Sequence, residues 1–355
     1  MHQRLTKGSL AAIYESLYPW NSVYDFVEQL KSTIAYKSED NAFIALNKPF
    51  GVGIYNTSDT NTSKQNQDKL LSGLKSSPKY CIRDALKPLS DEFKSSEPYT
   101  MVKSIDRYAS GLILISNDYE TYRRKLDYSM RVCRSKNIPP YGFRAITVGY
   151  PVVGSNKISE TVGMNLIEVD ELGDYKEPII VSQVTSKHRN QFVKDKRAYR
   201  VELEVKKTNR ELSTALVEVF VSSDLHNFTR CYISSKTAFI LGDVRFSKRI
   251  REILGKPIQV SAFKSSHRYD DSYEPLNSRL RNVLGVQRNA SIPLMLDLHV
   301  LRLKNFLDRK KKIDLVIKSP YVPAYFALTA ERLDLMDVQN LNHDTSNIDS
   351  DTVRI

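Results

Sequence analysis

Residues 102–115 read VKSIDRYASGLILI, and the fold is read most directly from this stretch. Leu112-Ile-Leu-Ile115 is an uninterrupted apolar run, which predicts a strand in the core. Before it comes Ala109-Ser-Gly111, a turn of small residues, and Asp106 lies on the loop that leads into this turn. A carboxylate placed just ahead of a rigid strand is fixed without burying its backbone, so Asp106 is a candidate catalytic residue. A loop aspartate is more often a turn-former or a cap, and both interpretations stay open at this point.

Apolar patterns elsewhere predict further strands. Residues 42–46 (AFIAL) and 143–148 (FRAITV) are short runs with strand character. Apolar residues alternate with charged ones over 201–205, and residues 216–221 form a second β-rich run. The polar residues 208–210 between these two runs predict a hairpin, so the runs are expected to pair as antiparallel strands.

Two segments carry helical signals. Within residues 1–37, apolar side chains recur at helical spacing, at Trp20, Val23, Phe26, Val27 and Leu30. A second helix is expected from Asn117, because Glu120 stands at the capping-box spacing. Hairpins mixed with helices indicate the α+β class, with a largely antiparallel central sheet flanked by helices.

The chain is expected to hold one catalytic domain over residues 38–335, because no composition shift divides this range. Residues 1–37 are interpreted as a leader with a helix and a candidate transit segment, since no acidic residue precedes Glu15. An ordinary leader explains that pattern equally well. Residues 336–355 are acidic and polar and are expected to be disordered.

The overall charge favours an anionic partner. Lysine and arginine number 53 against 41 acidic residues, which gives a net charge of +12 and a pI near 9.3. Such a surface attracts phosphate polyanions, although a generic basic protein would show the same charge. The basic run Arg309-Lys-Lys-Lys312 is by itself typical of a solvated turn.

Several classes of site are excluded by motif. The sequence has no GxxxxGK[ST] loop, no GxGxxG loop and no GxSxG elbow, which argues against an ATPase, a dehydrogenase and a serine hydrolase. Its three cysteines, Cys81, Cys133 and Cys231, lie far apart, and no histidines show HxxxH spacing. We therefore expect no metal site and a reducing compartment. No apolar run approaches the length of a membrane span, so no membrane association is expected.

Residues 102–111 are similar to the HRLDxxTSG signature of the RluA-type pseudouridine synthases, with Asp106 at the position of the catalytic aspartate. Further elements of that family follow in the same order along residues 42–330. They are Ala45–Gly51 (dKPxG), Phe143–Gly149 (YxAxVxG), Leu216–Arg230 (LLEV…GRTHQIR), Phe239–Asp243 (PIxGD), Leu298–Val300 (LHA) and Ser319-Pro320 (aPLP). The mitochondrial members are the most similar, in a YPW leader and a long insertion between the middle strands.

The resemblance implies a pseudouridine synthase fold, an isomerase activity on RNA and no cofactor. It makes Asp106 and Arg230 the catalytic pair, where the guanidinium favours the ionised carboxylate. Without the resemblance, Arg230 reads as a surface arginine at a strand end. Phe143 is expected to stack on the flipped base, although a core residue of a strand looks the same. Asp106 acts either as nucleophile at C1′ or as base at C2′, and the sequence leaves both open.

The expected partner is a uridine-containing RNA, most of all mitochondrial rRNA, with tRNA and mRNA as further classes. The protein is then a monomer of the mitochondrial matrix that acts in rRNA processing. Phosphate contacts are expected from basic residues near the motif and on the predicted helix, namely Lys103, Arg107, Arg123, Arg124 and Arg131. Each of these charges is otherwise an ordinary solvated one.

The sequence departs from the family pattern at three places, and the first two favour a second hypothesis. Ser104 replaces the arginine of HRLD, Asn227-Phe-Thr229 replaces His-Gln-Ile, and Phe143 replaces the tyrosine of YxAxV. Tyr141 lies two residues back on the same strand face and offers a phenol in its place. The alternative is therefore a catalytically weak relative that binds RNA or assists mitoribosome assembly.

Overall fold

The computed structural model describes residues 10–55, 78–151, 156–168, 176–181, 198–243, 246–247, 250–253, 256–259, 276–287 and 292–336. Residues 1–9 of the predicted leader and residues 337–355 of the predicted tail lie outside these ranges. The predictions of a transit segment and of a disordered tail therefore remain predictions.

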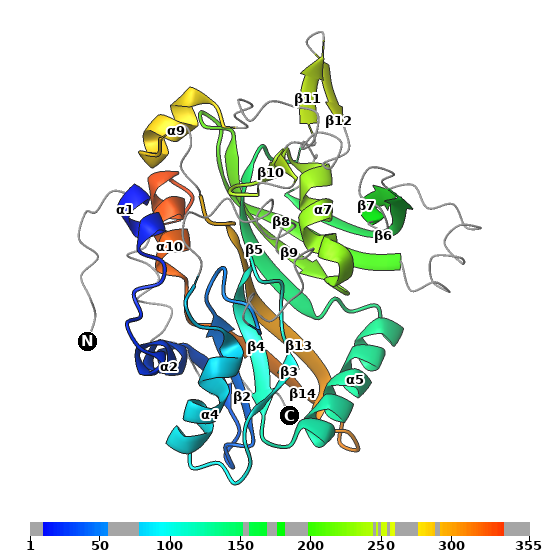
Figure 1. Cartoon of the computed structure of the whole chain (residues 1–355). Coiled ribbons are helices and arrows are strands. Elements are labelled where there is room, and N and C mark those ends of the chain that lie inside the picture. The colour runs from blue at the N-terminus through cyan, green and yellow to red at the C-terminus, as the bar shows by residue number, and fades with distance from the viewer. Residues whose placement is uncertain are drawn as a thin grey trace.

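The described elements mix helices with strands and hairpins (Figure 1). The helices are α1 (Leu10–Glu15), α2 (Val23–Ser32), α4 (Ile82–Glu92), α5 (Tyr119–Ser135), the 3₁₀ turn η3 (Leu225–Asn227), α7 (Phe228–Lys236), α9 (Ser278–Leu284) and α10 (Ala324–Arg332). The strands are β1 (Ile34–Lys37), β2 (Phe43–Lys48), β3 (Thr100–Lys103), β4 (Ser110–Ser116), β5 (Tyr141–Val148), β6 (Lys157–Glu168), β7 (Lys176–Val181), β8 (Ala198–Asn209), β9 (Thr214–Val221), β10 (Phe239–Ile240), β11 (Ile250–Ile253), β12 (Lys256–Gln259), β13 (Leu296–Asp308) and β14 (Ile313–Lys318).

Twelve of these strands form one sheet, in the order β1-β2-β4-β13-β5-β9-β8-β6-β7, with β3, β10 and β14 paired at its sides. The pairs are antiparallel except for β4 and β13, which run parallel. The predicted hairpin is confirmed as β8 and β9, joined by a turn after Asn209. The expectation of a mixed fold with a mostly antiparallel sheet is therefore confirmed.

Strands β2 and β4 are buried on both faces, which explains their uninterrupted apolar sequence. On one face the ring of Phe43 stacks on Tyr122 of α5, with 4.7 Å between ring centroids. On the other face Ile113 and Ile115 pack in one cluster with Phe26 of α2. The helix predicted within the leader is thus part of the core, and β1 after it extends the sheet.

Helix α5 begins two residues later than predicted, at Tyr119. The carboxylate of Asp118 accepts a hydrogen bond from the backbone N–H of Thr121 at 3.1 Å, so Asp118 is the N-cap. The side chain of Asn117 instead donates to the Ser95 hydroxyl at 2.8 Å. Asn117 and Asp118 are both residue types that cap helices. In the fold Asn117 is engaged with Ser95, and Asp118 caps the helix.

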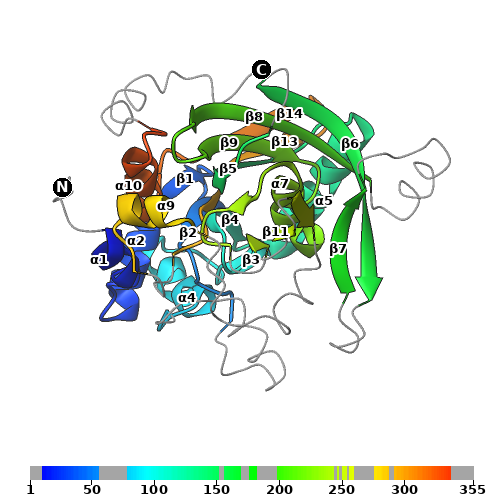
Figure 2. The same ribbon diagram turned by 90° about the horizontal axis from the view of Figure 1, so that it is seen from above.

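At its other end the sheet curls, and α7 lies inside the curve formed by β9, β8 and β6 (Figure 2). The ring of Phe228 on α7 stacks on Tyr199 of β8, with 4.0 Å between centroids. The helix thereby covers one face of the curled strands and carries its residues toward β4. Among the helices described, none has both the length and the apolarity needed to cross a membrane.

Candidate active site

Asp106 lies in the turn between β3 and β4, directly ahead of the buried strand. Its Oδ1 accepts a hydrogen bond from the backbone N–H of Tyr108 at 2.8 Å, and the N–H of Ala109 donates to its carbonyl at 3.2 Å. The side chain is 25% exposed. The carboxylate is therefore fixed by its own turn and still open to solvent.

A buried lysine ties this turn to the loop after β2. The side chain of Lys48 is almost wholly buried, and its Nζ lies within hydrogen-bond distance of four carbonyl oxygens, at 2.7 to 3.1 Å, those of Pro49, Val52, Arg107 and Ala109. Burial lowers the pKa of Lys48 to about 7, against the opposing attraction of Asp106. The Ala45–Gly51 element noted in the sequence thus supports the Asp106 turn through the contacts of Lys48 with the Arg107 and Ala109 carbonyls.

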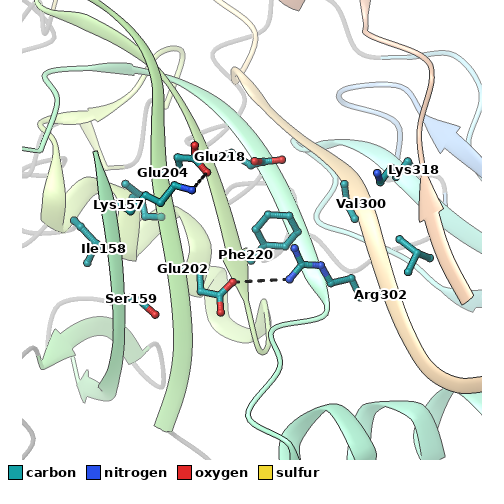
Figure 3. A pocket seen from close by; sticks show the side chains of 12 residues that line it. Lys157, Ile158, Ser159, Glu202, Glu204, Glu218, Phe220, Val300, Arg302 and Lys318 are labelled. Carbon is teal, nitrogen blue, oxygen red and sulfur yellow. Dashed lines mark ion pairs between the residues drawn. The ribbon is translucent and has the colours of Figure 1, made fainter. Parts of the chain in front are cut away.

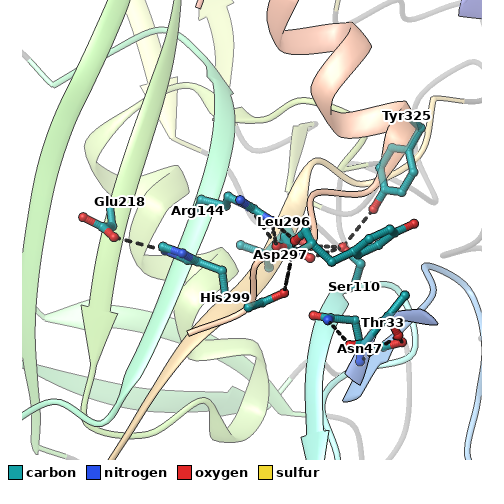
Figure 4. A network of polar contacts seen from close by, with 11 residues as sticks. Thr33, Asn47, Ser110, Arg144, Glu218, Leu296, Asp297, His299 and Tyr325 are labelled. Atoms are coloured by element: carbon teal, nitrogen blue, oxygen red, sulfur yellow. Dashed lines mark hydrogen bonds and ion pairs between the residues drawn. The ribbon is translucent and has the colours of Figure 1, made fainter. Parts of the chain in front are cut away.

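The small residues after Asp106 dock the turn on β13. Gly111 has a φ of +118°, and a Cβ there would lie 2.2 Å from the carbonyl oxygen of Leu298. Ser110 donates a hydrogen bond to the carboxylate of Asp297 at 2.7 Å, and the Tyr325 hydroxyl lies 3.0 Å from Ser110 Oγ (Figure 4). Glycine at position 111 is therefore required by the close parallel pairing of β4 and β13.

Asp297 also pairs with a partly buried arginine from the neighbouring strand. The Nε of Arg144 on β5 donates to Asp297 Oδ2 at 2.8 Å, and its Nη2 donates to the Tyr321 carbonyl at 2.7 Å. Four of the sequence elements, around 110, 144, 297 and 320, therefore meet in one polar network (Figure 4). Elements that are far apart along the chain therefore contact one another in the folded protein.

Arg230 lies on α7 and its side chain is only 4% exposed, so its interpretation as a surface residue at a strand end is wrong. The guanidinium makes two hydrogen bonds to Asp243, from Nε to Oδ2 at 2.9 Å and from Nη2 to Oδ1 at 2.7 Å. Its Nη1 lies 3.6 Å from Asp106 Oδ2. Burial by itself disfavours the charge, yet Asp243 and then Asp106 raise the pKa of Arg230. The guanidinium is thus held by one carboxylate and turned toward the other.

A third carboxylate, Asp224, lies at the end of β9 before α7. Its Oδ1 accepts hydrogen bonds from the backbone N–H of Thr229, at 3.2 Å, and from the Thr229 hydroxyl. Burial raises its pKa to about 6, with Lys103 opposing the shift and Asp106 adding to it. His226 and Asn227, which follow it, both have left-handed backbone angles. This strained turn sets the start of α7 and hence the place of Arg230.

The two aromatic residues of β5 are both enclosed. Phe143 has no exposed surface and belongs to the main core, so its ring presents no open face for a base in this structure. Tyr141 lies on the same strand face and is 9% exposed, and the Lys103 ammonium sits 5.1 Å from its ring centroid. Burial raises the pKa of Tyr141. The stacking role of Phe143 stays a prediction that requires the site to open.

The expected RNA-contacting residues divide into two groups. Lys103 donates to the Ser104 carbonyl at 2.5 Å, Arg107 donates to that of Gly51 at 2.9 Å, and both side chains are partly buried at the Asp106 turn. The other group, Arg123, Arg124 and Arg131, lies on the exposed surface of α5. The structure thus places the first group at the Asp106 turn and the second along α5, where Arg123 donates to the Val102 carbonyl of β3.

Asp243, Asp224, Lys48 and Asp297 were not among the predicted site residues. Asp243 and Lys48 stand inside quoted motifs, so the motif itself was the available signal. Asp224 also falls within the quoted Leu216–Arg230 stretch, although its hydrogen bonds to Thr229 appear only in the fold. Asp297 stands just before the quoted Leu298–Val300 element, and its role comes from the distant Ser110. Within the described part of the chain, no group of three or more metal-binding side chains occurs.

A large hollow lies on the other face of the sheet. This groove of about 560 Å³ is lined by side chains of β6, β8, β9, β13 and β14, among them Glu202, Phe220 and Arg302 (Figure 3). The residues of the Asp106 site take no part in its lining. The presence of a hollow alone therefore does not identify the candidate catalytic site.

The sequence matches no protein-family model and no curated protein sequence. Among solved structures, human RNA pseudouridylate synthase domain-containing protein 4 is similar with a TM-score of 0.54 at 17% identity, over 89% of this chain and 98% of that chain. Human RNA pseudouridylate synthase domain-containing protein 1 matches at 11% identity with a TM-score of 0.43, over 90% of this chain and 96% of that chain. The first of these similarities concerns the fold, and by it this chain has the fold of an RNA pseudouridylate synthase domain over most of its length.

Proposed function

We propose that the protein is an RNA pseudouridine synthase of the RluA type and that Asp106 is its catalytic carboxylate. One observation carries the proposal: the buried Arg230, itself fixed by Asp243, points its Nη1 at Asp106 from 3.6 Å. The carboxylate stands on a turn held by Lys48, within a pseudouridylate synthase fold. Such rigid support is what a single catalytic carboxylate requires.

The reaction needs only bond exchange within one nucleotide. The N1–C1′ bond breaks, the uracil turns, C5 joins C1′, and the proton lost from C5 is balanced by one gained at N1. Asp106 attacks C1′ or removes a proton at C2′, and both routes start from the ionised carboxylate. Arg230 positions that carboxylate, and Phe143 is the proposed platform for the flipped base once the site opens.

Mitochondrial rRNA is the proposed substrate and the matrix the proposed location, with tRNA and mRNA as further substrate classes. The basic net charge of +12 and the resemblance to mitochondrial members support this. Fusion of residues 1–40 to a reporter tests the location, and a reporter that stays in the cytosol counts against it.

A catalytically weak relative that binds RNA is the second candidate. Two observations favour it: Ser104 replaces the family's arginine, and the ring of Phe143 is closed off from solvent. It predicts RNA affinity without base isomerisation.

Mapping pseudouridines in cellular RNA with and without the protein separates the two candidates. The synthase predicts at least one uridine whose conversion disappears with the protein and returns with the wild-type chain. If every pseudouridine persists without it, the enzymatic proposal fails and the RNA-binding relative stands.

A further inference from the structure

Two basic segments that are far apart in the sequence lie side by side in the fold. They are α5 with its C-cap, residues 119–136, and the turn between β13 and β14, residues 308–312 (Figure 1). Together they carry ten lysines and arginines against three carboxylates. The guanidinium of Arg309 lies over the ring of Tyr128 on α5, 4.1 Å from its centroid, and so joins the segments. We name these two segments the α5–turn face.

The carboxylates of this face are already engaged within it. Glu120 lies 3.7 Å from Arg124, and Asp127 lies 3.3 Å from Arg123, each one turn along the helix. Asp308 accepts the backbone N–H groups of Lys310 and Lys311 at 2.8 and 2.9 Å. The remaining positive charge therefore faces outward, for the most part unneutralised.

The face is also rigid in shape. The Asp308 hydrogen bonds and the left-handed backbone of Lys312 fix the turn, and its three lysines are exposed. On α5, Arg124 and Arg131 share a helix face with Tyr128, because they stand four residues before it and three after it. From Arg124 to the C-cap the helix runs about 18 Å, enough to follow several successive phosphates.

The face continues directly from the candidate active site. Nη1 of Arg123 donates a hydrogen bond at 3.2 Å to the carbonyl of Val102, on the strand that leads into the Asp106 turn. Met130 of α5 accepts a hydrogen bond from the Tyr141 hydroxyl at 3.2 Å. An RNA with one base at Asp106 therefore has its flanking nucleotides beside α5.

We propose that the α5–turn face binds the phosphate backbone of a base-paired RNA stem next to the target nucleotide. This inference rests on the proposed function for its partner, and charge complementarity makes that partner RNA. Lys310, Lys311 and Lys312, which from the sequence alone are typical of a solvated turn, then contact the phosphates independently of RNA sequence. They position the stem while the pairing and loop of the RNA present the uridine.

A matched pair of triple variants tests the face. The face triple is Arg131→Gln, Lys310→Gln and Lys311→Gln, and the control triple is Lys87→Gln, Lys157→Gln and Lys318→Gln at exposed positions elsewhere. Both lower the net charge by three, so long-range attraction changes equally. Binding is measured by filter retention of a synthetic 12-base-pair RNA hairpin over a range of KCl concentrations, with thermal melts to verify folding.

The face triple is expected to weaken hairpin binding about tenfold or more and to lower the log–log salt slope by about 2 to 3. The control triple is expected to change affinity less than about threefold. Equal losses in both triples, or none in the face triple, overturn the proposal. So does a face triple that loses binding to phosphatidylserine vesicles and keeps its affinity for the hairpin.

The outcome is independent of catalysis, because the hairpin needs no target uridine. A face triple that loses hairpin binding, in a protein whose removal changes no pseudouridine, leaves the face standing and removes the synthase. If the protein is a fully active synthase and the face triple binds the hairpin as tightly as the wild type, the proposed function stands and the proposed RNA-binding face is wrong.

Discussion

Arginine–carboxylate pairs lie on both sides of the curled part of the sheet, in different surroundings. On the face that α7 covers, Arg230 and Asp243 pair with 4% and 0% of their side chains exposed. On the opposite face, Arg302 and Glu202 lie 3.8 Å apart with 33% and 41% exposed, at the edge of the large groove (Figure 3). Burial, not residue type or hollow volume, separates the candidate site from the groove.

The physical reason lies in the cost of desolvation. A buried arginine is tolerated only with close partners, so loss of Asp243 leaves a charge that water cannot reach and that only the more distant Asp106 balances. An exposed pair exchanges its partner for water at little cost. The face of the sheet that α7 covers, here called the near face, therefore keeps a fixed geometry that can position Asp106. The opposite face, which carries the groove and is here called the back face, holds charges that are free to reorient.

The largest expected effect is on catalysis. Asp106→Asn keeps the shape of the side chain and removes its charge, so isomerisation is expected to fall roughly 10⁴-fold or more. Release of tritium from RNA labelled at uridine C5 measures it, with Glu202→Gln on the back face as the control. Wild-type rates in the Asp106 variant contradict the assignment of this face as the active one.

Asp243→Asn removes the carboxylate that makes both hydrogen bonds to Arg230, so Asp106, 3.6 Å away, is the nearest charge left to balance the buried guanidinium. The free energy of unfolding is expected to fall by about 3 to 5 kcal/mol, as is typical when one member of a buried pair is removed. Urea unfolding at pH 7 measures the change. A loss below about 1 kcal/mol means that the Arg230–Asp243 pair behaves like an exposed one, and burial then does not distinguish the two faces.

Asp224→Asn sharpens the comparison through pH. The pKa of Asp224 is raised in the folded protein, from 3.8 to about 6, so folding favours its protonated form. The wild type therefore loses stability as pH rises from about 4 to about 6, and this penalty stays in full at pH 7. Because the asparagine amide of the variant cannot ionise, the variant is expected to gain about 2 kcal/mol on the wild type between pH 4 and pH 7.

Thermal or urea unfolding at both pH values tests this, with the difference between the two proteins as the readout. A difference that does not change with pH shows that the Asp224 carboxylate is not perturbed by its surroundings. The Thr229 hydrogen bonds remain available to the amide oxygen, which keeps the start of α7 in place.

The smallest expected effect lies on the back face. Glu202→Gln removes an exposed ion pair with Arg302, and the free energy of unfolding is expected to change by less than about 0.5 kcal/mol. The same urea series as for Asp243→Asn gives the comparison directly. A loss of several kcal/mol here makes the back-face groove a structural or functional site in its own right.

The sequence alone was enough for the elements whose signal is local. The apolar run at 112–115, the hairpin over 201–221 and the apolar spacing of residues 23–30 follow from periodicity, because a strand or helix imposes its own repeat on buried residues. The position of Asp106 on a turn ahead of β4 was also predicted, since a small-residue turn before an apolar run is a local pattern. The start of α5 was missed by two residues, because cap choice depends on neighbours in space.

Only the tertiary structure decided what surrounds Asp106. Arg230 reads as a surface residue until α7 folds into the curled sheet and brings Asp243 against it. Lys48 reads as an ordinary charge until four carbonyls close around it, and Arg309 reads as part of a solvated turn until Tyr128 lies beneath it. Burial and partner distance are properties of chain segments tens to hundreds of residues apart. No local pattern contains them, and they determine which charges have a fixed place.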